Sequence, residues 1–222
     1  MENIAQLSQN QISSDRAIHT LKAEGLECVR NDMVLFSELS LSLEGGEILQ
    51  IEGPNGCGKT SLLRIISGLA LPNQGCVYWN GTDIHDYKWE YLKEIFYVGH
   101  HNGIKNELTP LENINIALAL SISHLKVSPI EILSEFGLRG YEDVPTGKLS
   151  SGQRRRVALA RLLCVDASLW ILDEPFTSID DAGRNKFKGM IEEHLDRGGM
   201  VIIVSHDPVN FPNHQLKKIR LR

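Results

Sequence analysis

The residues with the clearest chemical meaning form a glycine-rich stretch, GPNGCGKTS, at positions 53–61. It matches the spacing G-x-x-x-x-G-K-[ST], with a strand-like run before it and a helix-like run after it. Glycines let a backbone wrap around an anion, so that N–H groups and the positive end of the next helix face phosphate oxygens. The stretch therefore predicts a loop for nucleotide phosphates formed by Gly53, Pro54, Asn55, Gly56, Cys57, Gly58, Lys59, Thr60 and Ser61.

Three side chains of this loop are expected to contact a bound nucleotide. Lys59 would reach the β- and γ-phosphates, Thr60 would ligate Mg²⁺, and Ser61 would add a hydroxyl to the phosphate cradle. The alternative is a glycine-rich turn that binds nothing, which the flanking strand and helix disfavour.

A pair of acids follows downstream, in the sequence LWILDEP at 169–175. An apolar strand that ends in two acids would place Asp173 near the metal and Glu174 beside the γ-phosphate. There a carboxylate orients or deprotonates the attacking water, which makes Glu174 the candidate catalytic base. Acids that merely cap a helix are the alternative, which the apolar run and the upstream phosphate loop disfavour.

A third element, LSSGQ at 149–153, opens a strongly patterned helix. The free N–H groups and the hydroxyls at such a helix start suit either a second phosphate or an ordinary helix cap. The residues alone leave both interpretations open.

The elements that must position these residues read as an α/β fold. Strand-like runs occur at 21–29, 39–43, 47–53, 76–81, 95–99, 169–174 and 200–206, and helix-like runs at 59–67, 110–122 and 128–138. The runs at 169–174 and 200–206 are nearly all apolar, which is typical of central parallel strands buried on both faces. We expect a P-loop NTPase core with a mostly parallel sheet and an N-terminal antiparallel β part. A polar N-terminal extension covers 1–20, the domain covers 21–222, and a helical subdomain is inserted at about 103–165.

Composition narrows the class of protein. The chain has 222 residues, of which 42% are hydrophobic, and its formal net charge of -5 gives no basic excess for nucleic acid. Its four cysteines are scattered without C-x-x-C spacing, which predicts neither a zinc site nor a disulfide framework. The N-terminal stretch lacks the apolar core of a signal peptide, and no apolar run reaches the roughly 18 residues of a spanning helix.

Taken together, the motifs resemble those of ATP-binding cassette (ABC) transporter ATPases. That resemblance covers residue 21 to the C-terminus and implies ATP and Mg²⁺ as ligands. It also implies that two copies pair head to tail, so that the signature of one copy meets the γ-phosphate held by the other. The residues it assigns are the signature Ser150, Ser151, Gly152 and Gln153, the aspartate loop TSID ending at Asp180, and a catalytic switch histidine at His206 in VIIVSH.

Further stretches, among them GHHNGIKNELTPLENI and LWILDEPFTSID, are similar to the ATP-binding subunits of haem exporters in cytochrome c biogenesis, the CcmA type. That likeness implies a peripheral subunit on the cytoplasmic side of the inner membrane, bound to integral membrane subunits. Its ATP hydrolysis would drive release of a haem-loaded chaperone, and haem itself would not bind this chain. The alternatives are an ATPase subunit of another ABC transporter and a soluble ABC-type ATPase acting on ribosomes or DNA.

Three positions depart from the usual family pattern. Ser151 replaces the second glycine of the signature, which a helix start tolerates. Arg30 stands where an aromatic ring usually lies against adenine, so its planar guanidinium either stacks on the base or is solvated. His100 stands where most members have the glutamine that touches Mg²⁺ and the attacking water, which makes it a candidate switch-loop residue and a further candidate Mg²⁺ ligand. A zinc site at this position is disfavoured because the sequence has no further ligands at suitable spacing, and covalent haem is disfavoured because it has no C-x-x-C-H motif.

Overall fold

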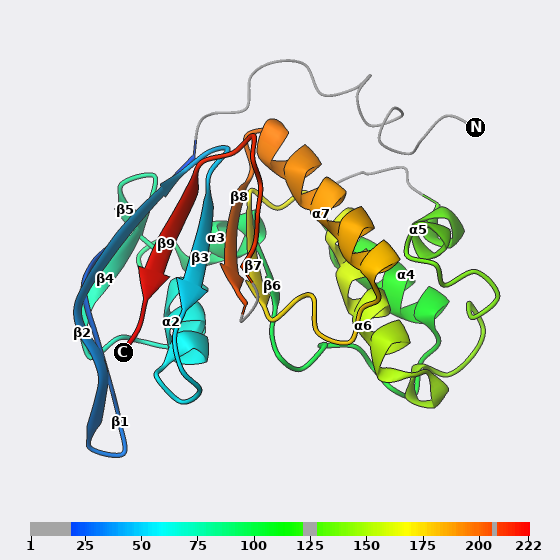
Figure 1. The fold of residues 1–222 in the computed structure, drawn as a ribbon, viewed down its shortest axis with the longest axis horizontal. Coiled ribbons are helices and arrows are strands. Elements are labelled where there is room, and N and C mark those ends of the chain that lie inside the picture. Colours follow the sequence, from blue (N-terminus) through cyan, green and yellow to red (C-terminus); the bar gives the residue numbers. More distant parts are fainter. Residues whose placement is uncertain (1–18, 122–127, 206–207) are drawn as a thin grey trace. The chain divides into compact units, whose positions relative to one another are not determined.

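The computed structural model describes residues 19–121, 128–205 and 208–222 of the chain (Figure 1). The chain divides into two compact units. Among the described residues, the sheet unit comprises 19–103 and 167–222, and the helical unit comprises Ile104–Asp166. The extension expected at 1–20 lies outside the described residues up to residue 18, and His206 lies outside them as well.

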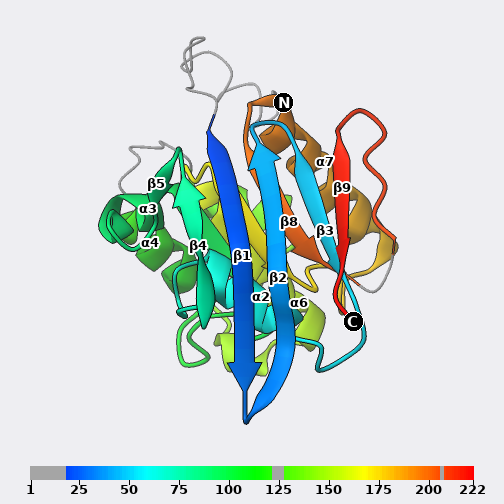
Figure 2. The same ribbon diagram turned by 90° about the vertical axis from the view of Figure 1, so that its left-hand side faces the viewer.

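An antiparallel sheet forms the first layer of the sheet unit (Figure 2). Its strands are β1 (Thr20–Arg30), β2 (Met33–Glu44), β4 (Gln74–Trp79) and β5 (Thr82–Asp83), in the order β2-β1-β4-β5. The β1–β2 hairpin turns through two residues in the left-handed region, Asn31 (φ 49°) and Asp32 (φ 61°), as a two-residue hairpin loop of this kind requires. This sheet is the antiparallel β part that the sequence predicted.

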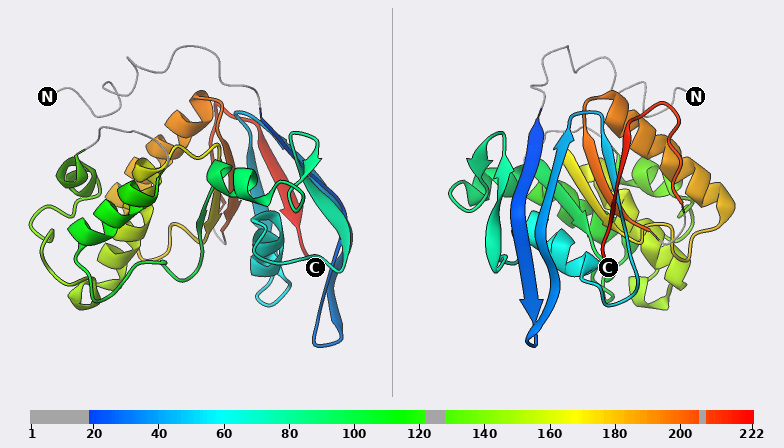
Figure 3. Two further views of the ribbon diagram at one scale, coloured as in Figure 1. Left: turned by 180° about the vertical axis from the view of Figure 1, so that it is seen from behind. Right: turned by 60° about the vertical axis from the view of Figure 1, so that its left-hand side comes forward.

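A second sheet of five strands is parallel throughout (Figure 3). It contains β3 (Ile48–Glu52), β6 (Ile95–Val98), β7 (Leu169–Asp173), β8 (Met200–Val204) and β9 (Leu216–Arg220), in the order β6-β7-β8-β3-β9. Every residue of β7 and β8 is buried. The prediction of central parallel strands from their apolar sequences is therefore confirmed, and so is the α/β class.

One hydrophobic core joins both sheets to helix α2 (Lys59–Ile66). Its buried side chains come from β1, β2, β3, β4, β7, β8 and α2, and include Leu21, Leu43, Ile51, Leu63, Val77, Ile171 and Ile202. Helix α3 (Lys88–Glu94) is attached beside α2, because the Tyr91 hydroxyl donates to the carbonyl of Ile66 at 2.6 Å. The helix that follows the phosphate loop is thus held by the core rather than by its own length of eight residues.

The other side chains of the parallel strands pack against helix α7 (Asp181–Asp196). The ring of His194 on α7 stacks on Trp170 of β7, with ring centroids 4.0 Å apart and planes 8° from parallel. Its Nε2 lies 3.3 Å from the carbonyl oxygen of Met200. The ring of Phe187 on the same helix meets Phe176 edge to face. Both faces of β7 are therefore covered, as a buried parallel strand requires.

The described part of the helical unit, residues 104–121 and 128–166, contains helices and 3₁₀ turns and no strand. Its elements are α4 (Pro110–Leu120), α5 (Pro129–Glu135), η1 (Thr146–Lys148), α6 (Ser151–Ala160) and η2 (Arg161–Cys164). Reciprocal capping boxes begin α4 at Thr109 and α6 at Ser150. Within the described ranges of the whole chain, no helix combines the length and the apolar character needed to cross a membrane.

The same substitution should have opposite effects on stability at two glycines, one within α7 and one just after it. A Cβ at Gly199 would overlap the His194 ring, which the stack on Trp170 holds in place, whereas a Cβ at Gly189 in α7 meets nothing within 4 Å. Gly199→Ala should lower the free energy of unfolding by about 1–3 kcal/mol because it overpacks the core. Gly189→Ala should raise it by about 0.5–1 kcal/mol because alanine favours a helix. Urea unfolding measures both, and a Gly199→Ala variant as stable as the starting protein would contradict the packing argument.

Candidate active site

The predicted phosphate loop connects β3 to α2, and its glycines have conformations that other residues rarely adopt. Gly58, which precedes α2, has φ 101°, and a Cβ there would lie 3.1 Å from the Cβ of Leu35 and 3.2 Å from the ring of Phe36. Gly53 has φ 152°, and a Cβ there would lie 2.9 Å from the carbonyl oxygen of Leu221. The loop can therefore close only with glycine at both of its ends.

Lys59 is the first residue of α2, and its side chain folds back over the loop. Its Nζ donates to the carbonyl oxygens of Gly53 at 2.7 Å and Pro54 at 2.9 Å. These two hydrogen bonds hold the ammonium over the loop, at the start of a helix whose own partial charge is also positive. An anion that enters the loop would meet both charges.

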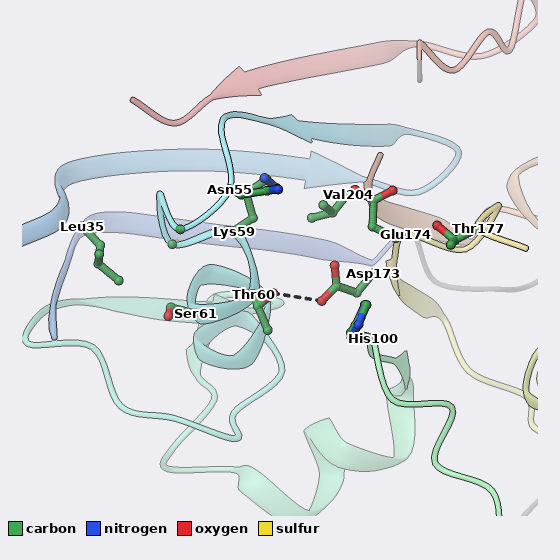
Figure 4. Close-up of a pocket in the computed structure, with 12 residues that line it drawn as sticks. Leu35, Asn55, Lys59, Thr60, Ser61, His100, Asp173, Glu174, Thr177 and Val204 are labelled. Carbon is green, nitrogen blue, oxygen red and sulfur yellow. Dashed lines mark hydrogen bonds between the residues drawn. The ribbon is translucent and has the colours of Figure 1, made fainter. Parts of the chain in front are cut away.

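The hydroxyl of Thr60 donates to Oδ2 of Asp173 at 3.0 Å, a bond drawn as a dashed line in Figure 4. Asp173 is the last residue of β7 and pairs in register with Val204, the last residue of β8. Because parallel strands all end at the same edge of the sheet, the acid at the end of β7 reaches the helix that follows β3. Asp173 is 3% exposed, so the carboxylate lies at the bottom of the site.

Glu174 directly follows β7 with its backbone in the left-handed region, at φ 50°. Its N–H donates to the carbonyl oxygen of Val204 at 2.9 Å, which fixes the turn. Non-glycine residues in this region are uncommon, and they cluster at functional sites. The turn directs the Glu174 side chain to the same cavity as the phosphate loop.

A cavity of about 470 Å³ brings these residues together (Figure 4). Six residues of the phosphate loop, the two acids and His100 share it, although they come from three separate parts of the sequence, and Gly53, Pro54 and Cys57 of the loop do not line it. Its lining consists of Leu35, Asn55, Gly56, Gly58, Lys59, Thr60, Ser61, His100, Asp173, Glu174, Thr177 and Val204. Such a cavity offers the Lys59 ammonium and the oxygen ligands that a nucleoside triphosphate with a hard cation needs.

The pKa of the Tyr97 phenol on β6 is affected by a charged group of this site. Burial raises the pKa of its phenol above the ordinary value of 10, the Asp173 carboxylate raises it further, and Arg64 opposes the change. The phenol is therefore neutral at physiological pH.

Three residues of the cavity, Leu35, Thr177 and Val204, were not predicted as site residues from the sequence. Leu35 on β2 forms an apolar wall, and Thr177 follows the acidic pair. Thr177 lies in the TSID stretch and Leu35 in a strand pattern, so each had a local signal. Arg30 ends β1 beside the hairpin turn, is exposed and does not line the cavity. Its stacking on adenine stays a prediction.

The LSSGQ stretch lies in the helical unit and begins α6. The Ser150 hydroxyl accepts from the N–H of Gln153 at 3.1 Å, and Oε1 of Gln153 accepts from the N–H of Ser150 at 2.9 Å. Ser150 and Ser151 are exposed, and Gly152 is half-buried. The stretch is therefore a helix cap, and its contact with a second phosphate stays a prediction.

Asp180 has a comparable position in the sheet unit, where it begins α7. Its Oδ1 accepts from the N–H of Gly183 at 3.2 Å.

A family model described as ABC transporter matches residues 36–177, a range that includes the phosphate loop, the signature and both acids. The chain belongs to the ABC transporter family. As an ABC transporter ATPase it binds and hydrolyses ATP, which confirms the enzyme class that the motifs predicted.

Two relatives place this ABC ATPase more narrowly. The cytochrome c biogenesis ATP-binding export protein CcmA of Methylococcus capsulatus is 49% identical over 187 residues, which cover 84% of this chain and 90% of that protein. The protein of the same name from Histophilus somni is 46% identical over 202 residues, covering 90% of this chain and 92% of that protein. The likeness to CcmA-type subunits seen in the sequence is thereby confirmed.

Solved structures support the ABC fold. An ABC transporter ATP-binding protein from Pyrococcus furiosus superposes with a TM-score of 0.75 at 27% identity, covering 91% of this chain and 97% of that one. An ATP-binding cassette solved as a post-hydrolysis dimer with ADP and Pi superposes with a TM-score of 0.74 at 24% identity, covering 84% of this chain and 88% of that one.

Replacement of the candidate base separates chemistry from binding in this ABC ATPase. Glu174→Gln keeps the shape of the side chain but cannot accept a proton, so turnover should fall by about 10²–10⁴-fold while ATP affinity changes little. Phosphate release and equilibrium binding of a fluorescent ATP analogue measure the two effects. Glu193→Gln, at an exposed acid of α7, is the matched control and should leave both unchanged. Turnover by Glu174→Gln at the starting rate would show that Glu174 is not the base.

Proposed function

We propose that this chain is the ATP-hydrolysing subunit of an exporter complex that serves cytochrome c biogenesis. The observation that carries the proposal is the 49% identity to a protein named for that role, over 84% of this chain. The cavity supplies the chemistry, because phosphate loop, acids and His100 lie together in it.

In this proposal the phosphate loop binds the ATP phosphates. Backbone N–H groups between Gly53 and Gly58 face the phosphate oxygens, and Lys59 moves its ammonium from the carbonyls of Gly53 and Pro54 to the β- and γ-phosphates. Ser61, which lines the same cavity, adds a hydroxyl. Pro54, Asn55, Gly56 and Cys57 complete the loop.

The oxygen atoms of Thr60 and Asp173 fit Mg²⁺, a hard cation that binds few protein ligands and leaves its other positions to phosphates and water. Mg²⁺ would neutralise charge that develops on the phosphates. His100 lines the same cavity and is a further candidate ligand, directly or through water.

Glu174 accepts the proton of the attacking water in this mechanism. Its turn is fixed by the backbone hydrogen bond to Val204, so the backbone that carries the carboxylate is already in place before ATP arrives. His100 holds the same water by a hydrogen bond. His206 is proposed as the switch histidine from its sequence position after β8, and it lies outside the described residues.

Two copies of the chain would complete two sites. We propose that Ser150, Ser151, Gly152 and Gln153 at the start of α6 bind the γ-phosphate held by the second copy, because a helix start offers N–H groups and a partial positive charge. Asp180 would lie at the contact between the copies. A cassette of the same fold has been solved as a dimer, which supports the pairing of two copies.

The complex would also contain integral membrane subunits, with this chain at the cytoplasmic face of the inner membrane. Hydrolysis would drive the release of a haem-loaded chaperone on the far side, without haem binding to this chain. Affinity purification of the tagged full-length chain from detergent-solubilised membranes tests this. Copurification of small integral membrane proteins and a haem-binding protein is expected, whereas copurification with ribosomes or DNA, or with membrane subunits of an unrelated exporter, would contradict it.

A pair of variants tests the composite site. Lys59→Ala should weaken ATP binding to the isolated chain by at least about tenfold, because the loop loses its side-chain cation. Ser150→Ala should leave that affinity within about twofold but lower turnover by at least about tenfold, since the hydroxyl acts on the second copy's nucleotide.

The control for lost helix capping is Ser150→Asp. Aspartate keeps an N-cap acceptor for the N–H of Gln153, but its carboxylate would repel the second copy's γ-phosphate, so turnover should stay at least about tenfold below that of the starting protein. Turnover restored to the starting rate by Ser150→Asp would show that Ser150 only caps its helix.

A further inference from the structure

A buried polar cluster in the helical unit is centred on Asn113 and Thr146, which are 5% and 0% exposed. The amide oxygen of Asn113 accepts from the N–H of Lys105 at 2.9 Å. Its nitrogen, which has two hydrogens to donate, lies within hydrogen-bond distance of three acceptors: the carbonyls of Lys105 at 3.1 Å and Thr109 at 2.9 Å, and the hydroxyl of Thr146 at 3.0 Å. That hydroxyl has a single hydrogen and lies within hydrogen-bond distance of two carbonyls, those of Lys105 and Leu108. The two side chains therefore bind the segment 105–109 at several points.

Backbone hydrogen bonds join the same segment to the turn η1. The N–H of Thr146 donates to Leu108 at 2.9 Å, and the N–H of Gly147 donates to Asn106 at 2.8 Å. A Cβ at Gly147 would lie 3.2 Å from the carbonyl oxygen of Asn106, so the two stretches run in close contact. The segment 105–109 and η1 thus form one packed body.

The turn η1 leads directly into the signature. The N–H of Leu149 donates to the carbonyl of Thr146 at 3.1 Å, and the carbonyl of Leu149 accepts from the guanidinium of Arg154 at 2.6 Å. Leu149 is 4% exposed, which anchors the chain one residue before Ser150. Hydrogen bonds therefore connect Lys105, Asn113 and Thr146 to Leu149, the residue that directly precedes the cap of α6.

We propose that Asn113 and Thr146 are positioning residues that fix Ser150 by locking η1 to the segment 105–109. Buried polar groups are costly unless every partner is in place, so this cluster tolerates only one register between the two stretches. The functional part of this inference rests on the proposed role of Ser150 at the second copy's γ-phosphate.

Two substitutions at Thr146 and one control isolate the hydroxyl. Thr146→Val removes it at nearly constant volume, and Thr146→Ser retains it. Ser168→Ala, in the sheet unit, removes another buried hydroxyl, which donates to Glu94 at 2.7 Å. Asn113→Leu removes more hydrogen bonds than Thr146→Val and is more damaging to folding. Thr146→Val is therefore the variant used for the test.

Native-state hydrogen exchange of the full-length chain reads the position of Ser150 without reference to catalysis. Thr146→Val should speed exchange of the Gln153 amide, which Ser150 caps, by at least about tenfold, whereas Thr146→Ser and Ser168→Ala should change it by less than about threefold. The amides of β8 serve as an internal reference for global opening. No change at Gln153, or an equal change at Gln153 and in β8, would overturn the positioning role.

Turnover then tests whether the effect acts through Ser150. Thr146→Val should lower the ATPase rate and leave the nucleotide affinity within about twofold, whereas Thr146→Ser should keep the starting ATPase rate. The double variant Thr146→Val/Ser150→Ala should have an ATPase rate within about twofold of that of Ser150→Ala alone. Multiplied losses in the double variant would overturn the inference. A normal rate for Ser150→Ala alongside faster exchange at Gln153 would instead contradict the composite site of the proposed function and leave the lock supported.

Discussion

The hydrogen bond between Thr60 and Asp173 is the contact on which the candidate site depends. It joins the start of α2 to the end of β7, two places separated by more than a hundred residues of sequence. It forms because β3 and β7 belong to one parallel sheet with β8 between them, so that both strands end at the same edge. The hydrophobic core that α2 shares with both sheets holds the helix at this edge. The site is thus a consequence of strand order.

Much of the sheet unit could be predicted from the sequence, because its central parts carry strong local signals. The glycine and lysine spacing of 53–61 identified the loop, and the apolar runs of β7 and β8 identified buried parallel strands. These elements are buried on both faces, which leaves little freedom in residue type.

Elements at the margin of the sheet unit were missed. β9, LKKIR, is an edge strand whose lysines pair with acids on β3 and near it, so it reads as polar. α3 buries only Tyr91, which is too little for a periodic pattern. α7 does carry apolar residues at helical spacing, Phe187, Ile191 and Leu195, and could have been identified. The buried face of α7 thus gives its sequence an apolar pattern at helical spacing, whereas β9 lacks an apolar pattern because its lysines pair with acids.

The site residues that belong to a sequence motif could be predicted, whereas those brought to the cavity by packing between distant parts of the chain could not. The loop, Asp173 and Glu174 follow motifs, whereas Leu35 reaches the cavity only because the β1–β2 hairpin packs beside Gly58. The lock between Asn113 and Thr146 joins residues 33 positions apart and has no linear signature at all.

The left-handed backbone at Glu174 lowers the stability of the fold at the same residue whose side chain is proposed to act in ATP hydrolysis. A side chain with a Cβ held at φ 50° costs about 1–2 kcal/mol relative to a glycine, which adopts this conformation freely. The most stable residue for this turn is therefore one that lacks a carboxylate. Any search for more heat-resistant forms of this protein by backbone relaxation alone would favour replacing the residue proposed to activate water, so gains in thermal tolerance must be sought elsewhere in the fold.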